Sequence, residues 1–121
     1  MQKKDCEHVQ EHENAVEKAR GRMLTATELE KVCGIFRILS EPSRMKIVLA
    51  LLEGQMCVYH LTEVCGGTVS GISHQLRVLR DNRIVKAQRF GKNIEYSIMD
   101  EHVREIVETG KAHLACEKAV F

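Results

Sequence analysis

The strongest constraint on how this chain folds comes from four side chains with metal-ligand atoms near the C-terminus: Asp100, His102, His113 and Cys116. The surrounding residues read as one amphipathic helix. In an α-helix, His102 and His113 would point in directions only about 20° apart but stand roughly 16 Å apart along the axis. Bonds to a metal such as zinc are only about 2 Å long, so one ion cannot touch both histidines of one helix.

An antiparallel second copy of this helix would resolve the spacing. In a two-fold dimer, Asp100 and His102 of one subunit would lie beside His113 and Cys116 of the other, twice. The sequence therefore predicts a homodimer with symmetric metal sites across its interface. Asp100 also has a structural interpretation as an N-cap, because strand-like residues 94–98 precede it and helical sequence follows. Four potential ligands in one register favour the metal site.

Composition sets broad limits on the chain. Its 121 residues predict one domain, for which a dimer interface would add useful burial. The cysteines number five, an odd count, and we find neither a signal peptide nor an apolar run long enough to cross a bilayer. We therefore expect a cytoplasmic protein without membrane contact, whose thiols are ligands or core residues and not disulfides.

Positive charge is concentrated in one region, although the formal net charge is only +1. Residues 70–93 contain the single acid Asp81 and six basic residues, Arg77, Arg80, Arg83, Lys86, Arg89 and Lys92. Both termini lean acidic. This local patch predicts a polyanionic partner such as a nucleic acid.

Helix signals divide the chain into an arm and a folded domain. Residues 1–22 are polar and charge-mixed, which predicts a flexible arm whose first dozen residues are mobile, followed by a domain at 23–121. Thr27 is the expected cap of the first domain helix, with Glu30 three residues on, and apolar residues repeat at helical spacing to Ser40. Ser40 is then expected to cap a second helix with Pro42 in its first turn.

The central region reads as a winged helix-turn-helix. A short helix at 57–65 is stopped by Gly66 and Gly67, and a further helix begins near Ser70. Residues 84–89 and 94–98 then predict a two-stranded hairpin with a basic tip at 90–93. The fold class is therefore mainly α with a β-hairpin wing (α+β), a homodimer through its N- and C-terminal helices.

One face of the helix after Ser70 suits the major groove of DNA. Ser70, Ser73, His74 and Arg77 recur at helical spacing. Small residues allow close approach, whereas arginine and serine reach base edges and phosphates. An ordinary solvated face is the alternative, and the basic hairpin that follows favours DNA, because a wing lies along the phosphate backbone. The expected DNA contacts are Ser70, Ser73, His74, Gln75, Arg77, Arg89 and Lys92.

The segment Ser73–Arg80, the wing and the spacing of Asp100, His102, His113 and Cys116 together resemble the ArsR/SmtB family of metal-responsive winged-helix repressors, especially its zinc-sensing branch. The resemblance implies a homodimer that binds an operator inverted repeat in double-stranded DNA without metal. Binding of Zn(II), with Cd(II), Pb(II) or Co(II) as alternatives, then releases the operator and derepresses metal efflux or resistance genes. Zinc-sensing relatives carry Glu or His where this chain has Cys116, which leaves Cys116 or Glu117 as the fourth ligand.

A second metal site is also implied by the resemblance. Some relatives carry a cysteine where this chain has Cys57, and their remaining ligands come from the N-terminal arm. The corresponding ligand types here are Cys6, His8, His12, Cys57 and His60. The alternative is that Cys57 packs in the core and the arm is disordered. Cys33 and Cys65 lie at apolar helical positions, which predicts a buried structural role.

Three other functions are compatible with parts of the sequence. An enzyme with a Cys-His nucleophile is not expected, because no local pattern places an activated thiol beside an oxyanion donor. A metal-buffering protein would explain the ligands but not the wing. A thiol-based redox repressor on the same fold is the stronger alternative, because the cysteines are many for this length.

Overall fold

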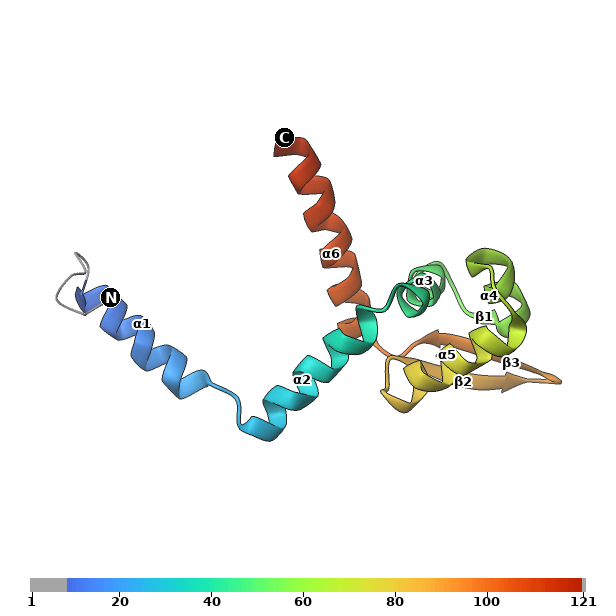
Figure 1. The fold of residues 1–121 in the computed structure, drawn as a ribbon, viewed down its shortest axis with the longest axis horizontal. Helices are drawn as coiled ribbons and strands as arrows, with labels where there is room; N and C mark the ends of the chain where they lie inside the picture. The colour runs from blue at the N-terminus through green and yellow to red at the C-terminus, as the bar shows by residue number, and fades with distance from the viewer. Residues whose placement is uncertain (1–8, 121) are drawn as a thin grey trace. The chain divides into compact units, whose positions relative to one another are not determined.

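The computed structural model describes residues 9–120, and the side chains of residues 10–116 within that range. The chain forms two compact units, residues 1–33 and 34–121. Within the described residues, no helix is long and apolar enough to span a membrane. The elements, labelled in Figure 1, are α1 (Val9–Arg22), α2 (Ala26–Leu39), α3 (Pro42–Leu51), β1 (Met56–Cys57), α4 (Val58–Cys65), α5 (Val69–Asp81), β2 (Val85–Phe90), β3 (Asn93–Ile98) and α6 (Glu101–Val120).

The first unit contains a helix where the sequence predicted a flexible arm. Helix α1 is rich in Glu, Lys, Arg and Ala, which are good helix formers, and its described side chains are all exposed. A helix of this composition can form without an apolar stripe, and the flexible attachment of residues 1–22 stays a prediction. The expected mobility of the first dozen residues falls largely on residues 1–8, which lie outside the described residues.

Helix α2 begins with a capping box two residues before the predicted one. The Thr25 N–H donates to Glu28 Oε1 at 2.9 Å, and the Glu28 N–H donates to Thr25 Oγ1 at 3.2 Å. Both Thr25 and Thr27 are followed three residues later by Glu, so the same signal occurs twice. The predicted cap at Thr27 was therefore wrong by half a turn.

Helices α3, α4 and α5 pack with the sheet around one core in the second unit (Figure 1). The cap of α3 is Glu41, not Ser40, because the Glu41 carboxylate accepts hydrogen bonds from the N–H groups of Ser43 and Arg44. Pro42 occupies the first turn as predicted. The largest fully buried side chains of the described core are Ile47, Val48, Leu51, Leu61, Leu76, Leu79, Ile84 and Val85. None of them is more than 2% exposed.

The predicted helix-turn-helix is confirmed. Gly66 and Gly67 adopt φ angles of 81° and 82°, a left-handed region that side chains disfavour, and they end α4. Thr68 then caps α5, accepting a hydrogen bond from the Gly71 N–H at 3.0 Å. The turn therefore fixes where the exposed face of α5 begins.

The wing is part of a three-stranded antiparallel sheet in the order β1-β3-β2. Phe90 pairs with Asn93, so the hairpin closes through Gly91 and Lys92, with Gly91 at φ 62°. The hairpin was predicted, but β1 was not. Met56 and Cys57 form a strand of only two residues, too short to show the alternation that identifies a strand.

We predict that Thr68→Ala lowers the free energy of unfolding by about 1 kcal/mol, because the first turn of α5 loses its N-cap acceptor. Thr68→Ser keeps the hydroxyl and is expected to restore most of that loss. Urea unfolding at one fixed protein concentration measures both variants. Equal stabilities of Thr68→Ala and wild type would contradict a capping role.

Candidate metal and DNA-binding sites

Helix α5 presents the expected polar face to solvent. Its buried residues are Ile72, Leu76 and Leu79. The side chains of Ser70, Ser73, His74 and Arg77 lie on exposed positions. The amphipathic pattern thus places the predicted DNA contacts of this helix on the surface.

Gln75, another predicted DNA contact, is half-buried and bound within the protein. Its Oε1 accepts a hydrogen bond from Arg44 Nη1 at 3.2 Å, and Arg44 Nε donates to the Ile38 carbonyl at 2.9 Å. Arg44 therefore ties α5 to the end of α2. The role of Arg44 could not be predicted from the sequence, since no local pattern links residues this far apart.

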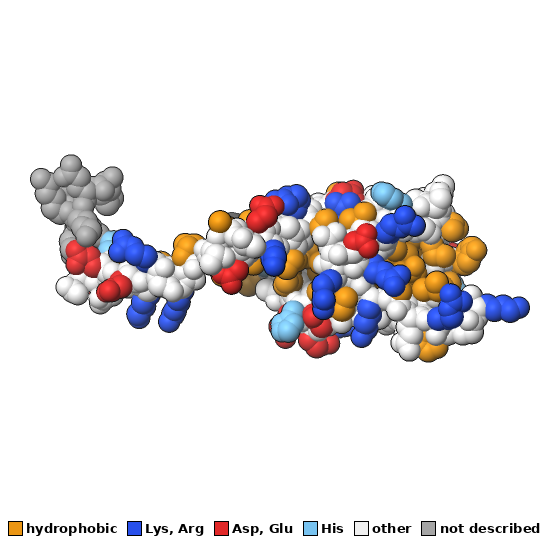
Figure 2. All heavy atoms as spheres, turned by 90° about the horizontal axis from the view of Figure 1, so that it is seen from below, with side chains coloured by type: hydrophobic (Ala, Val, Ile, Leu, Met, Phe, Trp, Pro, Cys, Tyr) orange, Lys and Arg blue, Asp and Glu red, His pale blue; other side chains and the backbone are white. Residues whose placement is uncertain are grey.

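The basic hairpin extends this surface. Arg89 on β2 and Lys92 in the turn are exposed, and among the described residues neither forms an ion pair. Figure 2 shows Lys and Arg side chains along the end of the unit that carries the hairpin. Between α5 and β3 lies a polar hollow of about 440 Å³, lined by Ser73, Leu76, Arg77, Arg80, Asp81 and Tyr96. Helix, hollow and wing form one surface suited to a phosphate backbone.

Asp100 and His102 come together at the start of α6. His102 Nδ1 lies 3.5 Å from Asp100 Oδ1, and the two side chains are 90% and 50% exposed, respectively. Asp100 also caps the helix, because its Oδ1 accepts from the Val103 N–H at 3.2 Å. That hydrogen bond, helped by His102, holds the pKa of the Asp100 carboxyl below its usual value. The carboxylate therefore both caps the helix and lies beside the His102 imidazole.

His113 and Cys116 lie further along the same unbroken helix and are exposed. Within the described residues of one chain, no three candidate ligands gather in one place. The donors present are carboxylate oxygen, imidazole nitrogen and thiol sulfur, which together fit a zinc-like ion. One chain thus holds these candidate ligands in two separate groups. The side chain of Glu117, the alternative fourth ligand, lies outside the described residues.

The second set of candidate ligands is described only in part. Cys57 Sγ and His60 Nδ1 lie 3.5 Å apart at the start of α4. His12 lies on α1, whereas Cys6 and His8 lie outside the described residues. The structure therefore brings together Cys57 and His60 of this set.

The two remaining cysteines differ from each other. Cys65 is half-buried against the core, and this burial raises the pKa of its thiol. Cys33 is exposed, so the prediction of a buried role was wrong for it. The apolar stripe of α2 is mostly uncovered in the single chain, because Leu29, Val32 and Phe36 are 48%, 39% and 53% exposed.

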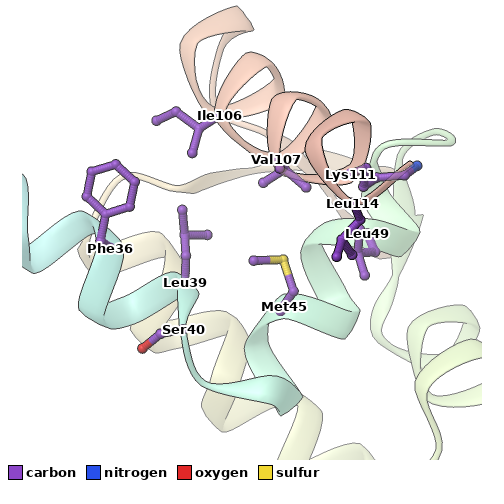
Figure 3. Close-up of a pocket in the computed structure, with 10 residues that line it drawn as sticks. Phe36, Leu39, Ser40, Met45, Leu49, Ile106, Val107, Lys111 and Leu114 are labelled. Atoms are coloured by element: carbon purple, nitrogen blue, oxygen red, sulfur yellow. The ribbon is translucent and has the colours of Figure 1, made fainter. Parts of the chain in front are cut away.

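An apolar groove of about 460 Å³ lies between the end of α2, α3 and α6. Figure 3 shows Leu39, Met45 and Val107 pointing toward one another from these helices. Leu114, further along α6, also lines the groove and is 57% exposed. Lys111 is the one charged residue in the lining, so the groove is an apolar surface open to solvent.

Known proteins share this arrangement. Residues 41–87 match the family described as bacterial regulatory protein, arsR family. The chain is 31% identical to the transcriptional repressor SmtB homolog of Synechocystis sp. over 90% of this chain and 83% of that protein. It is 34% identical to the cadmium resistance transcriptional regulatory protein CadC homolog of Staphylococcus aureus over 93% of each chain. The crystal structure of the AntR antimony-specific transcriptional repressor matches with a TM-score of 0.72 and 32% identity, covering 80% of this chain and 88% of that one.

The fold is a winged helix-turn-helix, and the relatives are transcriptional regulators and not enzymes. The chain belongs to the ArsR/SmtB family of metal-responsive transcriptional repressors. The resemblance drawn from the sequence is thereby confirmed.

Proposed function

We propose that the protein is a homodimeric cytoplasmic repressor that binds an operator inverted repeat when metal-free and releases it on binding Zn(II). Release derepresses genes for metal efflux or resistance. The names of the relatives refer to cadmium and antimony, so the family alone does not fix the metal. A thiolate from Cys116 would also accept Cd(II), Pb(II) or Co(II), because soft ligands favour soft and borderline cations.

The observation that carries this proposal is the exposed Asp100–His102 pair, 3.5 Å apart, on the same helix as His113 and Cys116. Neither half supplies enough ligands for a tetrahedral site. An antiparallel partner helix would supply the missing half to each pair. We therefore assign each site to Asp100 and His102 of one subunit with His113 and Cys116 of the other.

The dimer interface we propose includes the apolar groove, to which Phe36 and Leu39 at the end of α2 contribute. Leu114, which lines the groove, lies on the same helix as His113 and Cys116. A second copy would bury apolar surface beside the proposed metal sites. The same helices would then hold the subunits together and carry the ligands.

Release follows from geometry. A bound ion would supply a fixed connection between the two C-terminal helices. Asp100 and His102 would then hold one helix in a set relation to the other, and with it the separation of the two α5 helices. Half-sites one turn of DNA apart tolerate little error in that separation. A reversal from 99:1 to 1:99 occupancy needs about 5.5 kcal/mol of differential affinity in a two-state scheme.

The test is an operator-binding titration of the purified wild-type dimer. We expect tight binding without metal and loss of binding on addition of zinc. A parallel titration with a mild oxidant separates this function from the redox alternative. Release by oxidant but not by zinc would replace our proposal with the thiol-based repressor.

The wing gives a separate prediction. Arg89→Ala and Lys92→Ala are each expected to weaken operator binding across sequences, because both side chains are exposed and free to contact phosphates. The slope of log K against log salt should flatten by about one unit per lost contact. If the salt slope is the same in both variants as in wild type, the wing does not contact the DNA backbone.

The arm site gives another prediction. If Cys6, His8 and His12 join Cys57 and His60, cadmium should produce thiolate-to-metal charge-transfer absorption that falls in both Cys6→Ser and Cys57→Ser. The 3.5 Å approach of Cys57 Sγ to His60 Nδ1 supports the second half of this set. Absorption unaffected by Cys6→Ser would leave the arm without a metal role.

A further inference from the structure

Arg104 links the helix that carries the proposed metal ligands to the helix-turn-helix. It lies in the first turn of α6, and its side chain is 35% exposed. Arg104 Nη1 donates a hydrogen bond to the Leu52 carbonyl at 3.0 Å. Its Nε lies 3.5 Å from Glu101 Oε1 on the same helix. The guanidinium therefore contacts a backbone carbonyl through Nη1 and a carboxylate through Nε.

The Leu52 carbonyl is a favourable acceptor for this group. Leu52 is the C-cap of α3, and the last carbonyls of a helix lack partners within the helix. A cation at this end also meets the negative end of the helix dipole. The bond is charge-assisted and its planar donor has a fixed direction. It therefore fixes the first turn of α6 against the end of α3.

The position of this contact suits a transmitter of the metal signal. Glu101, which holds Arg104, stands between Asp100 and His102 in the sequence. On the other side, α3 contacts both α4 and α5. Among the described residues, no other side-chain hydrogen bond joins α6 to these three helices. A shift of the first turn of α6 would therefore act on the end of α3 through the hydrogen bond of Arg104, alongside the packing of Val103 in the core.

We propose that Arg104 is a positioning residue that passes the movement of Asp100 and His102 on metal binding to the helix-turn-helix through the Leu52 carbonyl. The inference rests on the proposed zinc-dependent release. Among the described residues, the Arg104 side chain bonds to the Leu52 carbonyl and to Glu101, and not to the side chains of Asp100 and His102 or to the exposed face of α5. Its loss should therefore lower the coupling between the two sites and leave each binding reaction intact.

The experiment measures three quantities in the full-length dimer: the zinc affinity, the operator Kd without metal, and the ratio of operator Kd with and without zinc. Arg104→Met keeps the length of the side chain but removes its donors. Relative to wild type, we expect the first two quantities to change by no more than about threefold and the ratio to fall at least about tenfold. Glu105→Gln, at the next and exposed position, is the matched control and should keep the wild-type ratio.

An unchanged ratio in Arg104→Met would overturn the proposal. So would loss of zinc affinity or of metal-free operator binding, because Arg104 would then belong to one site and not to the link between them. If Arg104→Met does not fold, Arg104→Lys takes its place. Lysine keeps the charge but not the fixed fork, so a ratio lowered about threefold is expected and a wild-type ratio contradicts the proposal. If the wild-type protein itself has the same operator Kd with and without zinc, the proposed zinc-dependent release is wrong, whatever Arg104 does.

Discussion

His102→Ala and His113→Ala dimers are each expected to bind the operator as wild type does without metal but to stay bound when zinc is added. Each substitution removes one ligand from both symmetric sites, and neither side chain lies on α5 or the wing. Both histidines are exposed, so truncation should leave the fold intact. A fluorescence anisotropy titration of labelled operator, with and without zinc, measures the effect.

The matched control is Glu108→Gln on the same helix. Glu108 is exposed and outside the proposed ligand set. This variant should release operator at the same zinc concentration as wild type. Full release by either histidine variant would contradict the ligand assignment.

Leu114→Glu is expected to produce monomers and to lower operator affinity at least about a hundredfold. Leu114 is 57% exposed in the single chain, so the subunit itself should fold, but a carboxylate at this position would put a charge into an interface whose groove is apolar except for Lys111. A monomer also loses the gain from binding two linked half-sites. Sedimentation equilibrium gives the oligomeric state, and an operator titration gives the affinity.

Val64→Glu provides the comparison for oligomeric state. Val64 lies on α4, outside the groove, and is 62% exposed, close to the exposure of Leu114. This variant should sediment as wild type does. A dimeric Leu114→Glu protein would place the interface elsewhere.

The parts of the fold that the sequence predicted correctly are those with strong local signals. Ile72, Leu76 and Leu79 repeat at helical spacing and are all buried, and the two glycines before Thr68 end one helix and allow the next to start. Caps were less certain because neighbouring residues compete for the same role. Thr25 and Glu41 act where Thr27 and Ser40 were expected.

Long-range contacts could not be predicted in this way. The hydrogen bonds from Arg44 to Gln75 and from Arg104 to Leu52 span 31 and 52 residues, respectively. No periodicity or local motif encodes them, since they depend on how the helices pack. The Asp100–His102 pair was accessible from sequence, because two residues at the start of a helix are already close. The contact of Arg104 could not be predicted, because its partner is the backbone carbonyl of Leu52, far away in the sequence.

The most direct test of the cross-subunit site is the zinc stoichiometry of a heterodimer made by mixing His102→Ala and His113→Ala subunits. In the proposed arrangement, one site of this heterodimer keeps both histidines and the other keeps neither. We therefore expect one tight zinc site per heterodimer, measured by competition with a chelating indicator, where each parent homodimer has none. Ligands drawn from a single subunit would leave every site broken. Absence of a tight site, with heterodimer formation confirmed independently, would contradict the account.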